Sequence, residues 1–255
     1  MRFWLLAFGL LGLGACTIRT NDTTDQGPSA SGTATTYAKP AVTPALQKTG
    51  GIAEEVYVFM RDVNGDGWMC TGTLVANDIV VTAGHCLEPK QFVSYWIVAP
   101  LAPGKPVVMA RNPKIFGGSY EDVANPDIGF LTLEKPVILP AYAELTDVVA
   151  DVEAGESVQG AAVVRTSEEP EAPFEVESGL TVTSTVEYGY EHGFGTPMFS
   201  KGGDSGAGLY LVENGKPAHK LIGVARQPEP TRNLDHFTRI DGDFIAWFKA
   251  QTNAP

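Results

Sequence analysis

Basic residues are scarce in this 255-residue chain. Lysine and arginine number 18 against 30 acidic residues, the formal net charge is -12, and no lysine- or arginine-rich cluster occurs. Because such a chain would repel a phosphate backbone, nucleic acid is excluded as a partner. With 44% hydrophobic and 19% charged residues, the composition is that of an ordinary globular protein with enough apolar surface for its own core.

Long apolar runs are also scarce. The one prominent run, "FWLLAFGLLGLG" at residues 3–14, is shorter than the roughly 20 residues that a spanning helix needs. With Arg2 before it, it predicts a signal peptide over residues 1–15. The run closes on Leu-Gly-Ala-Cys, which resembles a bacterial lipobox, so Cys16 is predicted to be lipidated. The alternative is an ordinary cleaved signal with a cysteine there by chance.

The predicted lipid sets an expectation for location. Two or three acyl chains on Cys16 would hold the protein at a membrane without a transmembrane helix. Thr17 follows Cys16, and by resemblance to Gram-negative lipoproteins this predicts an exported outer-membrane lipoprotein that faces the periplasm or the cell surface. Residues 16–50 are rich in Thr, Ser, Ala, Pro and Gly, and they predict a flexible linker.

Cysteine is the third scarce residue, with only three in the chain. Three is an awkward number for an exported protein, but lipidation of Cys16 leaves Cys70 and Cys86 as one possible pair. An exported protein can keep a disulfide.

Beyond about Val56 the chain consists of short β-rich runs separated by Gly, Pro, Asn and Asp. Examples are "VYVFM", "IVVTA", "IGFLTL" and "KLIGVA", at spacings typical of β-sandwiches and barrels. Only the end has helical spacing: Phe244, Trp247 and Phe248 stand at i, i+3 and i+4, with Asp243 as the expected N-cap. An all-β domain with a C-terminal helix is therefore expected.

Three residues stand out against this background. His85 follows an apolar run in "VVTAGHCL", Ser205 lies in the glycine-rich "SKGGDSGAG", and Asp127 opens the apolar run of "NPDIGFLTLEKP". Taken singly, each has an ordinary interpretation: a core or surface histidine, a glycine-rich turn, and an aspartate that caps a turn. A nucleophilic serine does, however, benefit from glycines that let the backbone N–H groups face a reaction intermediate.

Together these segments resemble the trypsin/chymotrypsin-like serine protease family. The blocks "CTGTLVANDIVVTAGHC", "DIGFLTL" and "GGDSGAG" are similar to the family's histidine, aspartate and serine blocks, in the same chain order. The resemblance implies two six-stranded antiparallel β-barrels with a C-terminal α-helix. The protease domain would span residues 51–255, with the boundary between the barrels at about residues 141–155.

The resemblance also assigns roles. Ser205 would be the nucleophile, His85 the general base and Asp127 the residue that orients the histidine. The backbone N–H groups of Gly203 and Ser205 would form the oxyanion hole. Cys70 and Cys86 match the family's disulfide beside the histidine.

Two departures from the family concern activation and specificity. The chain has no Ile-Val-Gly-Gly sequence, from which the family's zymogens free an ammonium group that pairs with the aspartate before the nucleophile, here Asp204. The partner of Asp204 is therefore open: the domain is either ordered without cleavage or held inactive. The residues that match the family's substrate pocket are Phe199, Ala225, Arg226 and Asp235.

Phe199 stands where trypsin has an acid, so selection of Lys or Arg is not expected from that position. Asp235 could supply a negative charge instead, but a solvated turn residue is the favoured interpretation. Arg226 stands where Trp is common, and its bulk and charge could redirect substrates.

The predicted function is a membrane-anchored serine endopeptidase of the bacterial envelope, with a protein or peptide as its substrate. The alternative is a protease-fold protein that binds peptides or partners without turnover. No cofactor and no metal are expected, because Asp62-x-Asn64-x-Asp66-Gly67 starts like a calcium loop but has Thr73 where the last ligand, Glu, is required. A hairpin turn is the favoured interpretation of this stretch. The sequence does not determine the oligomeric state.

Overall fold

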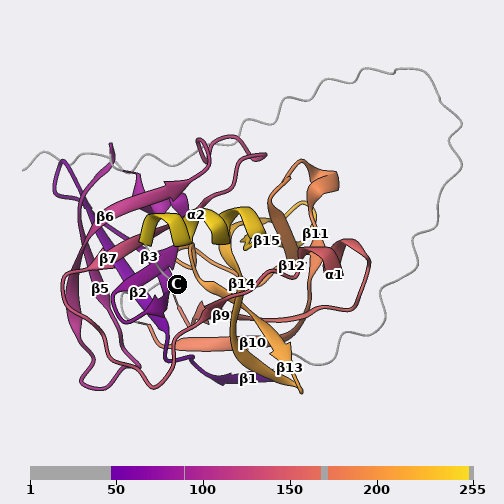
Figure 1. The fold of residues 1–255 in the computed structure, drawn as a ribbon, viewed down its shortest axis with the longest axis horizontal. Coiled ribbons are helices and arrows are strands. Elements are labelled where there is room, and N and C mark those ends of the chain that lie inside the picture. The colour runs from indigo at the N-terminus through magenta and orange to yellow at the C-terminus, as the bar shows by residue number, and fades with distance from the viewer. Residues whose placement is uncertain (1–46, 89, 168–171, 253–255) are drawn as a thin grey trace, which may run out of the picture. The chain divides into compact units, whose positions relative to one another are not determined.

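The first half of the domain is a closed barrel of six antiparallel strands in the order β2-β3-β4-β7-β6-β5 (Figure 1). The computed structural model describes residues 47–88, 90–167 and 172–252. The strands of this barrel are β2 (Glu55–Asp62), β3 (Gly67–Ala76), β4 (Ile79–Thr82), β5 (Phe92–Val98), β6 (Val107–Phe116) and β7 (Ile128–Leu133). In β5 the residues Tyr95 and Ile97 are buried while Trp96 between them is exposed, because successive side chains of a strand point to opposite faces.

The second half is a nine-stranded sheet with the order β1-β10-β9-β13-β14-β15-β12-β11, and β8 pairs with β14 off this path. Its pairs are antiparallel except that of β8 with β14. The strands are β1 (Gln47–Gly50), β8 (Glu144–Leu145), β9 (Gln159–Arg165), β10 (Phe174–Thr181), β11 (Thr183–Ser184), β12 (Gly193–Pro197), β13 (Gly208–Glu213), β14 (Lys216–Glu229) and β15 (Leu234–Arg239). The helices are α1 (Val149–Glu153), α2 (Gly242–Thr252) and the 3-10 turns η1 (Gly84–Leu87) and η2 (Val186–Tyr188).

The prediction was two six-stranded antiparallel β-barrels with a C-terminal helix. The fold class is confirmed as two antiparallel barrel-like sheets and that helix, but the second sheet has nine strands instead of six. Two further details differ from the sequence analysis. Strand β1 pairs with β10, although its residues fall at the end of the predicted linker. The Phe244 N–H donates to Asp241 Oδ1 at 2.9 Å, so Asp241 caps α2 and the expectation for Asp243 is wrong. Within the described part of the chain, no helix has the length and apolar character needed to cross a membrane.

Helix α2 follows β15, the last strand of the second half, but it packs against the barrel of the first half. The rings of Phe244 and Phe116 are 5.6 Å apart, and those of Trp247 and Phe248 lie 5.6 and 5.3 Å from Phe130. Such aromatic contacts bury large apolar areas. The packing of α2 therefore holds the two halves of the domain against each other. Residues at the interface of the two halves are fixed in position as a result.

A buried carboxyl group also links the two halves. Glu55 of β2 is completely buried, and its Oε1 accepts hydrogen bonds from Thr73 Oγ1 at 2.9 Å, the Gly208 N–H at 3.2 Å and the Tyr210 hydroxyl at 2.8 Å. Burial raises the pKa of Glu55 from 4.5 to about 8, against the opposing effect of these hydrogen bonds. The side chain is therefore protonated at neutral pH.

Glu55→Gln is expected to make folding stability less dependent on pH. Below pH 4.5 the folded and unfolded chains both hold the proton, whereas from 4.5 to 8 only the folded chain does, so the wild type loses stability as the pH rises. Glutamine does not titrate. Between pH 5 and 9 the variant should gain on the order of 3–5 kcal/mol relative to the wild type. Urea unfolding across this range measures the difference. With the exposed Glu156→Gln as the control, parallel curves for Glu55→Gln and the wild type would contradict the assignment.

Candidate active site

His85 lies in η1, the short turn that follows β4. Val80 and Val81 of β4 are fully buried, and the adjacent Thr82 donates its hydroxyl hydrogen bond to the Thr71 carbonyl at 2.6 Å. The strand that delivers the histidine is thus fixed by packing on one side and by β3 on the other. The His85 side chain itself is about a quarter exposed, at 26%, so its ring is supported and still accessible.

Asp127 stands just before β7 and holds His85 at two points. Its Oδ2 lies 2.7 Å from His85 Nδ1, and its Oδ1 accepts the His85 backbone N–H at 2.7 Å. The aspartate is 1% exposed, and its own backbone N–H donates to Thr238 Oγ1 at 3.2 Å. Because a carboxylate accepts hydrogen bonds, the proton of the neutral ring sits on Nδ1, which leaves the Nε2 lone pair free to act as a base.

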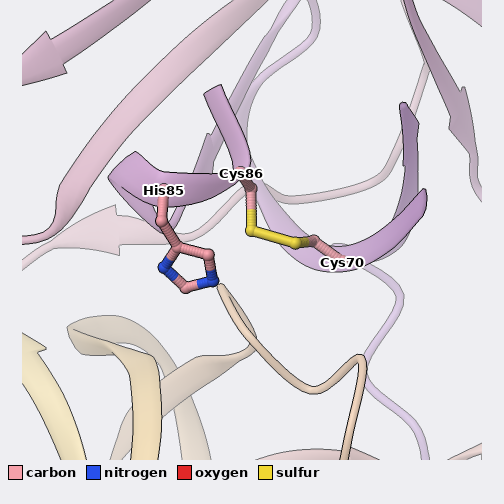
Figure 2. Close-up of side chains that lie close together, drawn as sticks. All are labelled: Cys70, His85 and Cys86. Atoms are coloured by element: carbon pink, nitrogen blue, oxygen red, sulfur yellow. A yellow bond between two sulfur atoms is a disulfide. The ribbon is translucent and has the colours of Figure 1, made fainter. Parts of the chain in front are cut away.

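A disulfide connects the histidine turn to β3 (Figure 2). Cys86, next to His85, is bonded to Cys70 of β3. One residue further along β3, the Thr71 N–H donates to the Ser205 carbonyl at 2.8 Å. The disulfide and this hydrogen bond therefore bring His85 and the Ser205 segment to the same part of β3.

The peptide groups around Ser205 are held from both halves of the domain. Thr71 Oγ1 donates to the Gly203 carbonyl at 3.0 Å, and the Gly206 N–H donates to the Ala225 carbonyl of β14 at 2.7 Å. Within the described ranges, neither the Gly203 N–H nor the Ser205 N–H donates to another group of the chain. Two N–H groups on a fixed loop can serve an oxyanion.

Asp204 has a partner that the sequence analysis left open. Its Oδ1 accepts the Arg165 backbone N–H at 3.0 Å and lies 3.6 Å from Arg165 Nε, and its Oδ2 accepts the Lys201 N–H at 3.0 Å. Burial raises the pKa of Asp204, while these hydrogen bonds and the two cations oppose the shift. Sequence reasoning missed Arg165, although a charge at the end of the apolar run "GAAVV" was an available signal.

A family model described as Trypsin matches residues 52–247. The chain belongs to the trypsin family. No match to a curated protein was found.

Three solved structures show how far the similarity extends. HL collagenase is 14% identical, with a TM-score of 0.63 over 80% of this chain and 94% of that one. Protease Anisep from Arthrobacter nicotinovorans is 13% identical, with a TM-score of 0.63 over 82% and 100%. A scabies mite inactivated protease paralogue is 19% identical, with a TM-score of 0.58 over 80% and 96%. At these identities the likenesses show that the fold is shared.

The resemblance to the trypsin family assigns four residues to the substrate pocket. Their charged groups, those of Asp235 and Arg226, form hydrogen bonds within the protein. Asp235 is 1% exposed and accepts the N–H groups of Phe199 at 2.7 Å and Ser200 at 2.8 Å and the Ser200 hydroxyl at 2.6 Å. The favoured interpretation of Asp235 as a solvated turn residue is therefore wrong. Its charge stabilises the segment before Ser205. The Phe199 ring lies 6.4 Å from that of Phe237, and Ala225 is buried.

Arg226 is also engaged. It is 6% exposed, and its Nε lies 3.9 Å from Asp127 Oδ2. Its terminal nitrogens donate to four carbonyls of one loop, at distances from 2.6 to 3.3 Å, those of Tyr120, Asp122, Val123 and Asn125. The same loop places the Tyr120 ring 5.7 Å from the His85 ring. Arg226 therefore organises the loop beside the histidine, and its guanidinium is not a free charge for a substrate.

A cluster of side chains of the types that bind metal ions also lies at this site. Among the residues that the structure describes, Cys70, His85 and Cys86 have ligand atoms within 4.8 Å of one another, but the two sulfurs are bonded together (Figure 2) and so are not thiolate ligands. In the stretch that starts like a calcium loop, Asp62 Oδ1 accepts the N–H groups of Asn64 at 2.8 Å and Asp66 at 2.9 Å. The stretch therefore forms the hairpin turn between β2 and β3, which is the interpretation that the sequence analysis favoured.

Proposed function

We propose that this trypsin-family protein is a serine endopeptidase that hydrolyses peptide bonds through an acyl-enzyme on Ser205. The observation that supports it most is the buried Asp127 carboxylate bound to both the Nδ1 and the backbone N–H of His85. This arrangement fixes the tautomer in which Nε2 accepts a proton, and a general base beside a serine needs that tautomer.

In the proposed reaction, Ser205 Oγ attacks the substrate carbonyl and His85 Nε2 takes the hydroxyl proton. Asp127 stabilises the imidazolium that forms, and His85 then gives the proton to the leaving amine. The N–H groups of Gly203 and Ser205 stabilise the oxyanion, a contribution of about 3 kcal/mol per donor. Water attacks the acyl-enzyme in the second half of the cycle, with His85 again as the base.

Cleavage of a peptide library tests the proposal. The purified protein should release products whose new ends identify a peptide bond, and Ser205→Ala should release none. The exposed Ser157→Ala is the matched control and should cleave like the wild type. If the wild type cleaves no library member, a protein with this fold that binds peptides without turnover is the better description. The library products also define the specificity, for which Asp235 and Arg226 offer no free charge.

The location is part of the proposal, although Cys16 lies outside the described residues. We propose a bacterial envelope lipoprotein, anchored by acyl chains on Cys16 and tethered through a linker. About thirty flexible residues have an r.m.s. span of ~30 Å, enough to let the domain reach proteins near the membrane.

Cys16→Ser is expected to abolish acyl labelling and to move the protein out of the membrane fraction, because the acyl chains are the proposed anchor. Radiolabelled fatty acid and fractionation measure both effects. The control is Thr17→Ser, which keeps the cysteine. A wild-type protein found soluble, with no acyl mass on its N-terminal peptide, would contradict the anchor without bearing on the catalytic proposal.

A further inference from the structure

We propose that Arg165 is a positioning residue that turns the Gly202–Gly203 peptide into the orientation an oxyanion hole requires, and that it does so without a cleaved N-terminus. The inference rests on the proposed function, because an oxyanion hole has a purpose only in catalysis. Its structural part concerns one peptide group and can be tested separately.

Arg165 is the last residue of β9 and is almost fully buried, with 1% of its side chain exposed. A buried guanidinium is costly unless its donors and its charge are satisfied. Among the described residues, contacts with two segments offset this cost: Nη1 lies 3.7 Å from Met69 Sδ of β3, and Nη2 donates to the Gly202 carbonyl of the loop before Ser205. The charge of the guanidinium is balanced in the same loop by Asp204, whose Oδ1 lies 3.6 Å from Nε. The planar guanidinium thus spans β3 and both sides of Gly203.

The contact with Gly202 determines where the Gly203 N–H points. A peptide group is planar and trans, so its carbonyl and its N–H point in opposite directions. Since Arg165 binds the Gly202 carbonyl, the N–H of the same peptide, which belongs to Gly203, must point away from the guanidinium. If the peptide turned over, its carbonyl oxygen would occupy the place of that N–H, and the oxyanion would meet an acceptor instead of a donor.

The contact between Arg165 and the loop requires a glycine at position 203. Its φ is +87°, and a Cβ at this position would lie 2.1 Å from Arg165 Nη2 and 2.6 Å from Cζ. Only glycine therefore lets the guanidinium lie directly against the backbone at this point. On the other side of the loop, Thr71 Oγ1 binds the Gly203 carbonyl at 3.0 Å, so the peptides before and after Gly203 are both held.

The same residue answers the question of Asp204. In the zymogens of the family that this chain resembles, chain cleavage frees an ammonium group, which pairs with the aspartate before the nucleophile. Here Arg165, 39 positions before Asp204 in the chain, contacts that aspartate through its backbone N–H and its guanidinium. The cation that orders the loop is therefore built into β9, and chain cleavage has no part in forming it.

Lys201 is the matched control, because it is the other cation close to Asp204. Its backbone N–H binds Asp204, but its exposed Nζ donates to the Thr166 carbonyl at 3.2 Å. Lys201→Met therefore removes a nearby positive charge without removing the contact to the Gly202 carbonyl.

The test compares Arg165→Ala with Lys201→Met in peptide hydrolysis and in crystal structures. Arg165→Ala should lower kcat by about 10²–10³-fold, the effect of losing one oxyanion donor, with KM changed by less than about threefold because substrate binding is separate from the oxyanion contact. Added guanidinium ion should restore kcat at least tenfold in Arg165→Ala and have no such effect on Lys201→Met. The crystal structure of Arg165→Ala should show the Gly202–Gly203 peptide turned over. Intact mass should show that the active wild type retains its linker.

The outcomes separate this inference from the proposed function. A wild type without turnover, together with a turned peptide in Arg165→Ala, would reject the proposed enzyme and retain the structural role of Arg165. A wild-type peptide orientation and an unchanged kcat in Arg165→Ala would overturn the inference, as would activity that appears only after cleavage of the linker. If Arg165→Ala does not fold, Arg165→Lys keeps the charge and loses the planar contact, and it should show the same fall in kcat and the same turned peptide.

Discussion

Ser205→Ala is expected to lower kcat for peptide hydrolysis by about 10⁶-fold while the domain remains folded. Alanine lacks the Oγ that forms the acyl-enzyme, and Ser205 holds its segment in place through its backbone carbonyl, which accepts the Thr71 N–H at 2.8 Å and is unaffected by the substitution. The loss of a triad nucleophile is typically of this size. Steady-state kinetics measures the fall, and thermal unfolding checks that the variant is folded.

His85, Asp127 and Ser205 form the proposed catalytic triad, and the losses of kcat from removing its members should not add. His85→Ala should cost nearly as much as Ser205→Ala, and the double variant should be little worse than either, because the base has no function without the nucleophile. Ser157→Ala serves as the control. Additive losses in the double variant would mean that His85 and Ser205 act in separate steps, contrary to the proposed mechanism.

Asp127→Asn is expected to lower kcat by about 10⁴-fold through the histidine tautomer. The His85 backbone N–H donates to Oδ1 of Asp127, while His85 Nδ1 faces Oδ2. In the variant the amide oxygen must stay on the backbone N–H, so the amide NH₂ is placed against Nδ1. Nδ1 must then accept a hydrogen bond, the ring proton moves to Nε2, and the base is lost.

The measurement for Asp127→Asn is kcat at neutral pH together with KM, which should change little because the aspartate is buried beneath the histidine. The exposed Asp151→Asn removes the same charge elsewhere and should leave kcat unchanged. A fall of less than tenfold in Asp127→Asn would show that Asp127 is not needed to set the tautomer.

The fold could be predicted, and His85, Asp127 and Ser205 could be singled out as candidate catalytic residues, because each of these predictions rests on short stretches of sequence. His85, Asp127 and Ser205 each stand at the boundary of an apolar run, and the glycines beside Ser205 describe a local backbone requirement. Runs of β-branched and aromatic residues such as "FVSYWIV", separated by turn residues, predict strands for the same reason, since both signals lie in neighbouring residues.

The contacts that escaped prediction join distant parts of the chain. Arg165 meets Asp204, and Arg226 binds carbonyls about one hundred residues before it, and no local pattern links such positions. Asp235 was misread because a charged residue beside a strand is usually solvated, whereas here the Phe199 and Ser200 N–H groups pair with it and make burial tolerable. Tertiary pairing decides whether a charged residue faces water.

If Ser205 is the nucleophile, it forms a covalent bond with the group it attacks, and reaction with a fluorophosphonate is a direct test of that role. The full-length protein is incubated with the probe, digested, and analysed by mass spectrometry. We expect one adduct per chain, on the peptide that contains Ser205, formed far more slowly in His85→Ala and absent from Ser205→Ala. Equal labelling of the wild type and Ser205→Ala, or no labelling of a folded wild type, would contradict it.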